Sequence, residues 1–166
     1  MKTKRIAILL FSLPLIISLN GQVIPFDNYS VQNGDELPSN MILDIEQDLQ
    51  GYLWLATPSG VVKFDGYSFK TYTTNDGLPD NNVDDIYIDS KQRIWFATEI
   101  GGLAVFQNNK IRSYNQNTGV VSNLAKTVFE DKNKNIWYTK REGFSRIFQD
   151  KTRTHARTKS LPVEIS

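Results

Sequence analysis

Apolar and polar residues alternate along most of this 166-residue chain, in short runs separated by turn residues. In the middle of the chain the runs fall at about residues 83–88, 93–98, 102–106 and 110–114, and each is rich in β-branched and aromatic side chains. Alternation with a period of two over five or six residues predicts half-buried β-strands. Asp, Asn and Gly between the runs favour tight hairpins. We therefore expect four-stranded antiparallel sheets.

The same pattern occurs three times. Trp54, Trp95 and Trp137 are spaced by 41 and 42 residues, within the strings GYLWLAT, RIWFAT and NIWYT. Four antiparallel strands every forty-odd residues is the period of a β-propeller blade. The predicted fold is therefore all-β, with about three four-stranded blades over residues 22–148. Because closed rings have four to eight blades, we expect an incomplete propeller. The three units cover about residues 33–74, 75–116 and 117–148.

The repeat also resembles a known family. The string GYLWLATPSGVVKFDG at residues 51–66, followed by YTTNDGLPDN at 72–81, is similar to the two-component regulator propeller repeat, and the resemblance extends over about residues 26–148. In that family the repeats form an extracytoplasmic sensor, followed by a β-sandwich, a membrane helix and a cytoplasmic histidine kinase. Members are typical of Bacteroidetes-type bacteria, and many sense carbohydrate fragments. The resemblance implies a sensor, and no kinase motif occurs in this chain.

Both ends of the repeat region depart from the regular pattern. Residues 26–29 align with the last strand of the first unit, 69–72, and predict an outer strand with no partners before it. The third unit carries Arg153 and Ala156 where an apolar fourth strand is expected. We expect an irregular or disordered tail over residues 149–166, and a chain that is a truncated product or one piece of a longer propeller.

The first 21 residues predict export. Lys2, Lys4 and Arg5 precede an uncharged, mostly apolar run over residues 6–19. This is the layout of a secretory signal peptide, and the run is short for a transmembrane helix. The chain is therefore expected in the periplasm, and associated with the membrane only if this segment stays uncleaved.

Several residue types recur at one place in each unit. The tryptophans could stack on sugar rings, but a periodic aromatic inside an alternating strand favours packing between blades. The aspartates could suggest cation loops, but one carboxylate per hairpin favours turn chemistry, because calcium needs six or more oxygen ligands together. The repeated positions expected to be structural are Trp54, Trp95, Trp137, Asp48, Asp89, Asp131, Gly60, Gly102 and Gly143.

The residue inventory predicts no catalytic site, metal site or cofactor. Cysteine is absent and His155 is the only histidine. A nucleophile–histidine triad or a typical zinc site would therefore have to rest on this one poorly placed residue. Adjacent strand residues point to opposite faces, so Asp84 and Asp85 are not expected to act as a catalytic pair. The formal net charge of +1 gives no indication of nucleic-acid binding.

The predicted function is a ligand-sensing or ligand-binding module of a two-component receptor. Binding residues are not identified by the sequence, although the loops at 37–41 and 78–82 lie where rigid scaffolds usually carry sites. A carbohydrate or another small ligand is one expected partner, and further blades or a second copy of the chain are others. The alternatives are a fragment of a propeller-type carbohydrate-active enzyme and a non-functional remnant.

Overall fold

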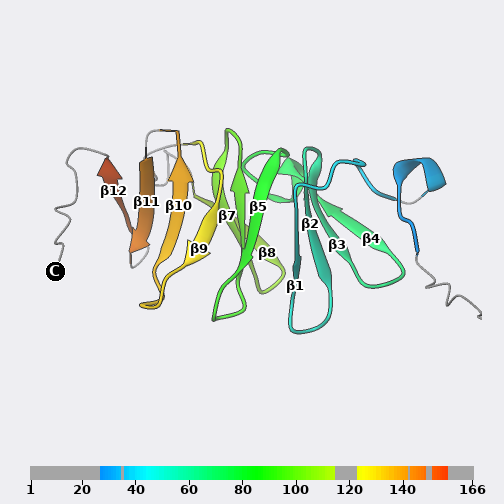
Figure 1. Ribbon diagram of the computed structural model, residues 1–166, viewed down its shortest axis with the longest axis horizontal. Helices are drawn as coiled ribbons and strands as arrows, with labels where there is room; N and C mark the ends of the chain where they lie inside the picture. Colours follow the sequence, from blue (N-terminus) through cyan, green and yellow to red (C-terminus); the bar gives the residue numbers. More distant parts are fainter. Residues whose placement is uncertain (1–26, 35, 115–122, 142, 149–150, 157–166) are drawn as a thin grey trace, which may run out of the picture.

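The computed structural model describes residues 27–34, 36–114, 123–141, 143–148 and 151–156, and consists of three four-stranded sheets that lie side by side in chain order (Figure 1). Every paired neighbour within a sheet is antiparallel, and the strands of each sheet follow one another as in a meander. We name the sheets blades 1, 2 and 3. Their strands are β1 (Asp44–Gln47), β2 (Leu53–Thr57), β3 (Gly60–Phe64) and β4 (Phe69–Tyr72); β5 (Val83–Ile88), β6 (Ile94–Thr98), β7 (Gly102–Gln107) and β8 (Lys110–Tyr114); and β9 (Val128–Glu130), β10 (Ile136–Lys140), β11 (Gly143–Phe148) and β12 (Lys151–Ala156).

The strands expected from alternation in the second unit are present within one residue at each end. The all-β fold with four-stranded antiparallel blades is confirmed, and a row of three blades fits an incomplete propeller. Almost no helix is present: the described residues contain two 3-10 turns, η1 (Val31–Asn33) and η2 (Thr74–Asp76).

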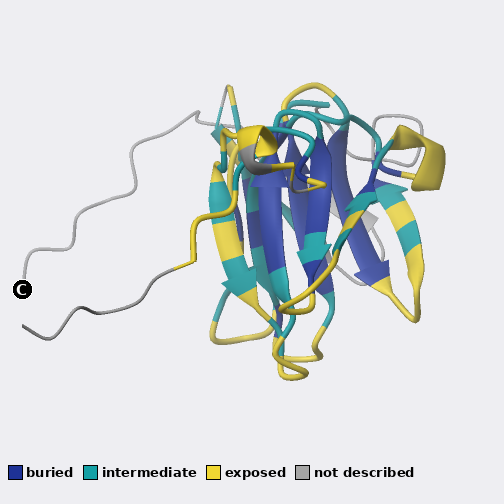
Figure 2. Ribbon diagram, turned by 90° about the vertical axis from the view of Figure 1, so that its right-hand side faces the viewer, coloured by how far each residue is buried: buried dark blue, intermediate teal, exposed yellow. Residues whose placement is uncertain are grey.

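Each blade has one face that carries the repeated tryptophan, which we call the Trp face, and an opposite face. The Trp face of blade 1 packs on the opposite face of blade 2, and the Trp face of blade 2 packs on the opposite face of blade 3. Buried strands consequently fill the centre of the molecule, while exposed residues gather at the turns (Figure 2). The first core contains Trp54, Ala56, Val61 and Tyr72 with Ile86, Ile94, Phe96 and Phe106; the second contains Trp95, Leu103, Val105 and Tyr114 with Val128, Ile136 and Tyr138.

The segment before β1 packs on the opposite face of blade 1. The Tyr29 ring meets Phe64 edge-on at 5.1 Å, much as Tyr72 meets Phe106 at 5.4 Å between blades 1 and 2. Leu37 is buried with Leu55 and Val62. Residues 27–30 nevertheless form no strand, because there is no neighbouring sheet for them to pair with in the described part of the chain. The aligned segment therefore reproduces the packing of an outer strand without its hydrogen bonds.

The end of blade 3 differs from the sequence-based expectation. Strand β12 lies inside the range expected to be irregular, and its residues 151–156 pair in register with residues 143–148 of β11. Strand β12 forms because its backbone pairs with β11, although its apolar pattern is weak. The sheet of blade 3 is thus complete without residues 26–29.

The predicted signal segment, residues 1–21, lies outside the described residues. Among the described residues, no helix is long and apolar enough to span a membrane.

Candidate functional site

The repeated aspartate and tryptophan are joined by a hydrogen bond in every blade. In each case the aspartate begins the first hairpin, and its Oδ2 atom accepts a hydrogen bond from the indole Nε1–H six residues later. The three distances are 2.8 Å for Asp48 and Trp54, 2.8 Å for Asp89 and Trp95, and 2.7 Å for Asp131 and Trp137. The expected turn role of the aspartates therefore occurs together with a second role, which is to orient the tryptophan.

Asp89 is the most enclosed of these carboxylates, with 1% of its surface exposed. Its Oδ1 atom accepts hydrogen bonds from the backbone N–H groups of Lys91 and Arg93, and its Oδ2 atom also accepts from Arg93 Nε at 2.6 Å. Burial opposes ionisation, but the bonds from Trp95 and Arg93 outweigh it and keep the pKa of Asp89 below its usual value. For Asp131, the bond from Trp137 is the main cause of a pKa lowered to about 2.

The repeated glycines begin the third strand of each blade with φ between 94° and 129°. At Gly60 a Cβ atom would lie 2.4 Å from the Tyr72 carbonyl oxygen, so this position requires glycine for both its φ and its close approach to β4. These residues build the scaffold. Within the described ranges, no group of three or more His, Cys, Asp or Glu residues is arranged to hold a metal ion.

The loops at 37–41 and 78–82 lead into the inner strands at one end of the blades. Each is held by an asparagine: Asn40 Oδ1 accepts the Val31 N–H and Asn81 Oδ1 accepts the Thr74 N–H, both at 2.8 Å. Asp80 Oδ2 also accepts the Ile100 N–H from the β6–β7 turn at 3.1 Å. The asparagine bonds tie each loop to the 3-10 turn before it, and the Asp80 bond ties the second loop to blade 2, so the polar groups of these loops are held in place at this end.

Polar side chains gather just inside this end, on the inner strands. Asp44 Oδ2 accepts the backbone N–H of Ile86 at 2.9 Å, and Asp85 Oδ2 accepts that of Val128 at 2.7 Å. Both bonds join consecutive blades. Burial is the largest cause that raises the pKa of Asp85 to about 6, and the carboxyl of Asp44 raises it further.

The neighbouring Asp84 has a different partner, because an irregularity in the pairing of β5 with β6 falls between Val83 and Asp85. Asp84 Oδ1 accepts a hydrogen bond from Lys126 Nζ at 2.8 Å, and this bond raises the pKa of Lys126. The two adjacent carboxylates thus bond to different groups, Asp84 to the Lys126 ammonium and Asp85 to the Val128 backbone N–H.

Two buried acceptor atoms at this place have no hydrogen-bond partner in the described part of the chain, namely Asp84 Oδ2 and Asn82 Oδ1. The Asn82 amide nitrogen is already used, since it donates to Glu99. An unpaired buried acceptor costs free energy, so both atoms favour contact with a further hydrogen-bond donor. We call Asn82, Asp84, Glu99 and Lys126 the blade-end cluster. The sequence pattern indicated the loop that carries Asn82, but it gave no signal for Glu99 and Lys126, which are distant from that loop along the chain.

Comparison with known proteins supports the repeat assignment. The family model described as "Two component regulator propeller" matches residues 77–99, which confirms the resemblance seen in the sequence. Histidine kinase P4 of Formosa agariphila is 44% identical over 69 residues, which are 42% of this chain and 5% of that protein. This chain therefore spans only a small part of the length of that relative.

Solved structures show the same fold. The extracellular domain of a hybrid two component system from B. thetaiotaomicron superposes with a TM-score of 0.71 at 25% identity, over 79% of this chain and 19% of that one. A virginiamycin B lyase from Staphylococcus aureus superposes with a TM-score of 0.57 at 18% identity, over 89% of this chain and 48% of the lyase. The second likeness shows the fold alone.

Proposed function

We propose that this chain is a ligand-sensing propeller module of an extracytoplasmic two-component receptor. The matched repeat, the similarity to a histidine kinase and the likeness to an extracellular sensor domain all support this assignment. In this proposal the blades bind a ligand in the periplasm, and the signal passes to a histidine kinase. The apolar segment near the N-terminus supports export.

The blade-end cluster is the observation that carries the binding role. Its two unpaired acceptors, Asp84 Oδ2 and Asn82 Oδ1, favour a ligand with hydrogen-bond donors, and the Lys126 ammonium beside them supplies donors for ligand oxygens. A ligand rich in hydroxyl groups has both kinds of group, since each hydroxyl donates one hydrogen bond and accepts others. An oligosaccharide is therefore the ligand class that fits these residues best.

Thermal unfolding in the presence of a panel of oligosaccharides tests the proposal. A sugar present at about one hundred times its Kd would stabilise the fold by about 2.7 kcal/mol, which raises the Tm by roughly 5–10 °C for a domain of this size. The Asp84→Ala variant should lose this shift, because it removes the unpaired acceptor and the partner of Lys126.

Asp65→Ala is the matched control. Asp65 is a hydrogen-bonded carboxylate in the β3–β4 hairpin, at the other end of blade 1, and should not affect the ligand-induced shift. The proposal fails if no oligosaccharide moves the Tm, or if the shift is equally large in Asp84→Ala and in the unsubstituted chain.

A further inference from the structure

The turn between β6 and β7 departs from the repeat. Strand pairing leaves two residues in the corresponding turns of blades 1 and 3, but three residues, 99–101, in blade 2. The turn lies at the same end of blade 2 as the blade-end cluster, and it supplies Glu99 to that cluster. A residue that the repeat does not require is free to take a role beyond the scaffold.

The longer turn is fixed against the loop at 78–82. The Asp80 carboxylate accepts the Ile100 N–H through Oδ2 at 3.1 Å and the Asn82 N–H through Oδ1 at 3.3 Å. The Glu99 N–H donates to the Asn82 carbonyl oxygen at 2.9 Å. Two oxygens of one carboxylate thus hold Ile100 next to Asn82, and therefore beside the blade-end cluster.

The side chain at the tip of this turn is apolar and exposed. A Cβ atom at Gly101 would lie 2.5 Å from the Pro79 carbonyl carbon, so glycine lets the turn approach the loop closely. The Ile100 side chain remains 65% exposed although its backbone is fixed. A single exposed apolar side chain is common on protein surfaces. Ile100 differs from the common case because it is held beside the unpaired acceptor of Asn82.

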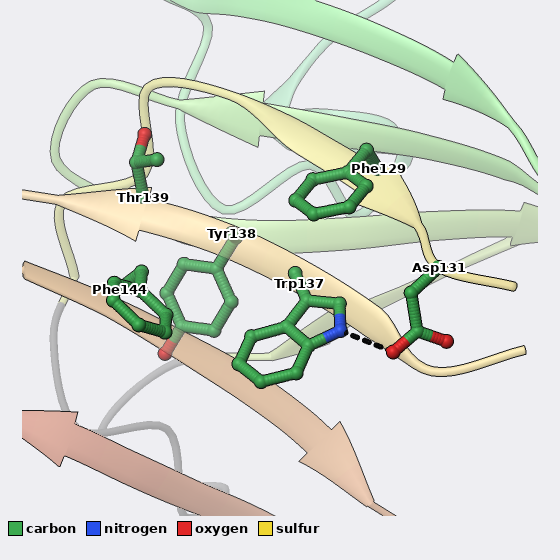
Figure 3. Close-up of a pocket in the computed structure, with 6 residues that line it drawn as sticks. All are labelled: Phe129, Asp131, Trp137, Tyr138, Thr139 and Phe144. Carbon is green, nitrogen blue, oxygen red and sulfur yellow. Dashed lines mark hydrogen bonds between the residues drawn. The ribbon is translucent and has the colours of Figure 1, made fainter. Parts of the chain in front are cut away.

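The aromatic pocket on blade 3 has a different origin. Figure 3 shows this pocket of about 530 Å³, whose lining includes Trp137, Phe129 and Phe144. Trp54 and Trp95 occupy the same position of the repeat as Trp137, and each is 1% exposed beneath the next blade. The rings at this pocket therefore belong to the face on which blades pack.

We propose that Ile100 supplies the apolar contact of the ligand site and that the ligand is a β-linked pyranose oligosaccharide. This inference rests on the proposed function of the blade-end cluster. In cellohexaose and similar β-linked chains, the pyranose rings form a ribbon with C–H groups on its faces and hydroxyls along its edges. One ring can therefore pack its C–H face on Ile100 while hydroxyls at its edge reach the polar groups of the cluster, of which the Lys126 side chain is 61% exposed.

Substitution of Ile100 tests this contact. Ile100→Ser removes the apolar surface, whereas Ile100→Val retains most of it. Both variants should leave the Tm of the free chain almost unchanged, because the side chain is exposed. The probes are cellohexaose, mannohexaose and chitohexaose, titrated by calorimetry. A probe that raises the Tm of the unsubstituted chain should bind Ile100→Ser about tenfold more weakly, and Ile100→Val less than about threefold more weakly.

Leu49→Ser is the matched control. Leu49 is also an exposed apolar residue in a turn, but it lies between β1 and β2 at the other end of blade 1. Its substitution removes a similar apolar surface away from the blade-end cluster. Leu49→Ser should therefore bind each probe as tightly as the unsubstituted chain does.

The heat capacity change of binding separates an apolar contact from a general effect on the site. Burial of apolar surface makes this change negative, so it should be less negative for Ile100→Ser than for the unsubstituted chain. An equal heat capacity change, or an affinity of Ile100→Ser within about twofold of the unsubstituted chain, would overturn the inference and leave the proposed function standing. The same holds if other oligosaccharides raise the Tm and none of the three probes does. If no oligosaccharide raises the Tm, the proposed function itself fails, and the inference fails with it.

Discussion

Removal of the Asp89 carboxylate is expected to be among the most destabilising single changes in blade 2. In Asp89→Ala, the fully buried indole N–H of Trp95 loses its acceptor, and a buried donor left unpaired costs about 1–3 kcal/mol. The backbone N–H groups of Lys91 and Arg93 lose their acceptor as well, which resembles the loss of a helix cap at about 0.5–2 kcal/mol. The expected total is about 2–5 kcal/mol.

Urea unfolding followed by circular dichroism measures this loss, and a double-mutant cycle isolates the bond to the indole. Trp95→Phe removes the donor, so Asp89→Ala should cost less in that background. The expected coupling energy is about 1–2 kcal/mol. A coupling below about 0.5 kcal/mol would show that the hydrogen bond to Trp95 contributes nothing, and that Asp89 acts through the hairpin alone.

The same substitution in blade 3 serves as a comparison. Asp131 makes the equivalent bond to Trp137, which is only partly buried. Water can replace the lost acceptor there, so Asp131→Ala should destabilise the chain less than Asp89→Ala. Equal losses of stability in the two variants would mean that burial of the indole does not determine how much its hydrogen bond contributes to the free energy of unfolding.

Two further predictions concern the inner strands and the repeated glycines. The pKa of Asp85 is raised to about 6 in the folded chain and is near 3.8 in the unfolded chain, so the folded state binds more protons between these pH values and its stability falls as the pH rises from about 4 to 6. Asp85→Asn should remove this fall and stabilise the chain by about 1–2 kcal/mol at pH 7, once solvent screening is allowed for. Urea unfolding at a series of pH values measures both effects. Gly60→Ala should lower the stability of the fold by about 2–4 kcal/mol, because the new Cβ atom clashes with the Tyr72 carbonyl in addition to the strain of a positive φ. At Gly66 the φ is also positive but the space is open, so Gly66→Ala should cost only the backbone strain. Equal losses of Tm in the two variants would contradict this reasoning.

Much of the architecture follows from local pattern. Alternation within residues 83–114 and the spacing of the tryptophans predict the strands and the blades, because each strand pairs with its neighbour in sequence through a short hairpin. Strand β12 has no such signal. Its backbone pairs with β11 although Arg153 and Ala156 interrupt the apolar pattern. Pairing with a neighbouring strand therefore determines that this segment is a strand, where its composition gives no indication.

The blade-end cluster was harder to predict than the strands. The contact between Asp84 and Lys126 joins residues from different blades, and no local spacing indicates it. The bond from Trp95 to Asp89, in contrast, has a usable signal, since an aspartate precedes each repeated tryptophan by six residues. A carboxylate that begins a hairpin and an indole on the following strand are close enough to bond whenever the turn is tight.

The packing of consecutive sheets has a consequence for how such chains change over evolution. Blade 2 is contacted by β1 and β2 on one side and by β9 on the other, so the principal contacts between sheets join units that are adjacent in sequence. Stability in such an array is approximately a sum over units and nearest-neighbour interfaces. Duplication or deletion of one 41- or 42-residue unit therefore preserves the chemistry of every remaining interface. Blade number can change in a single genetic step, while a new blade end becomes free to acquire a different ligand.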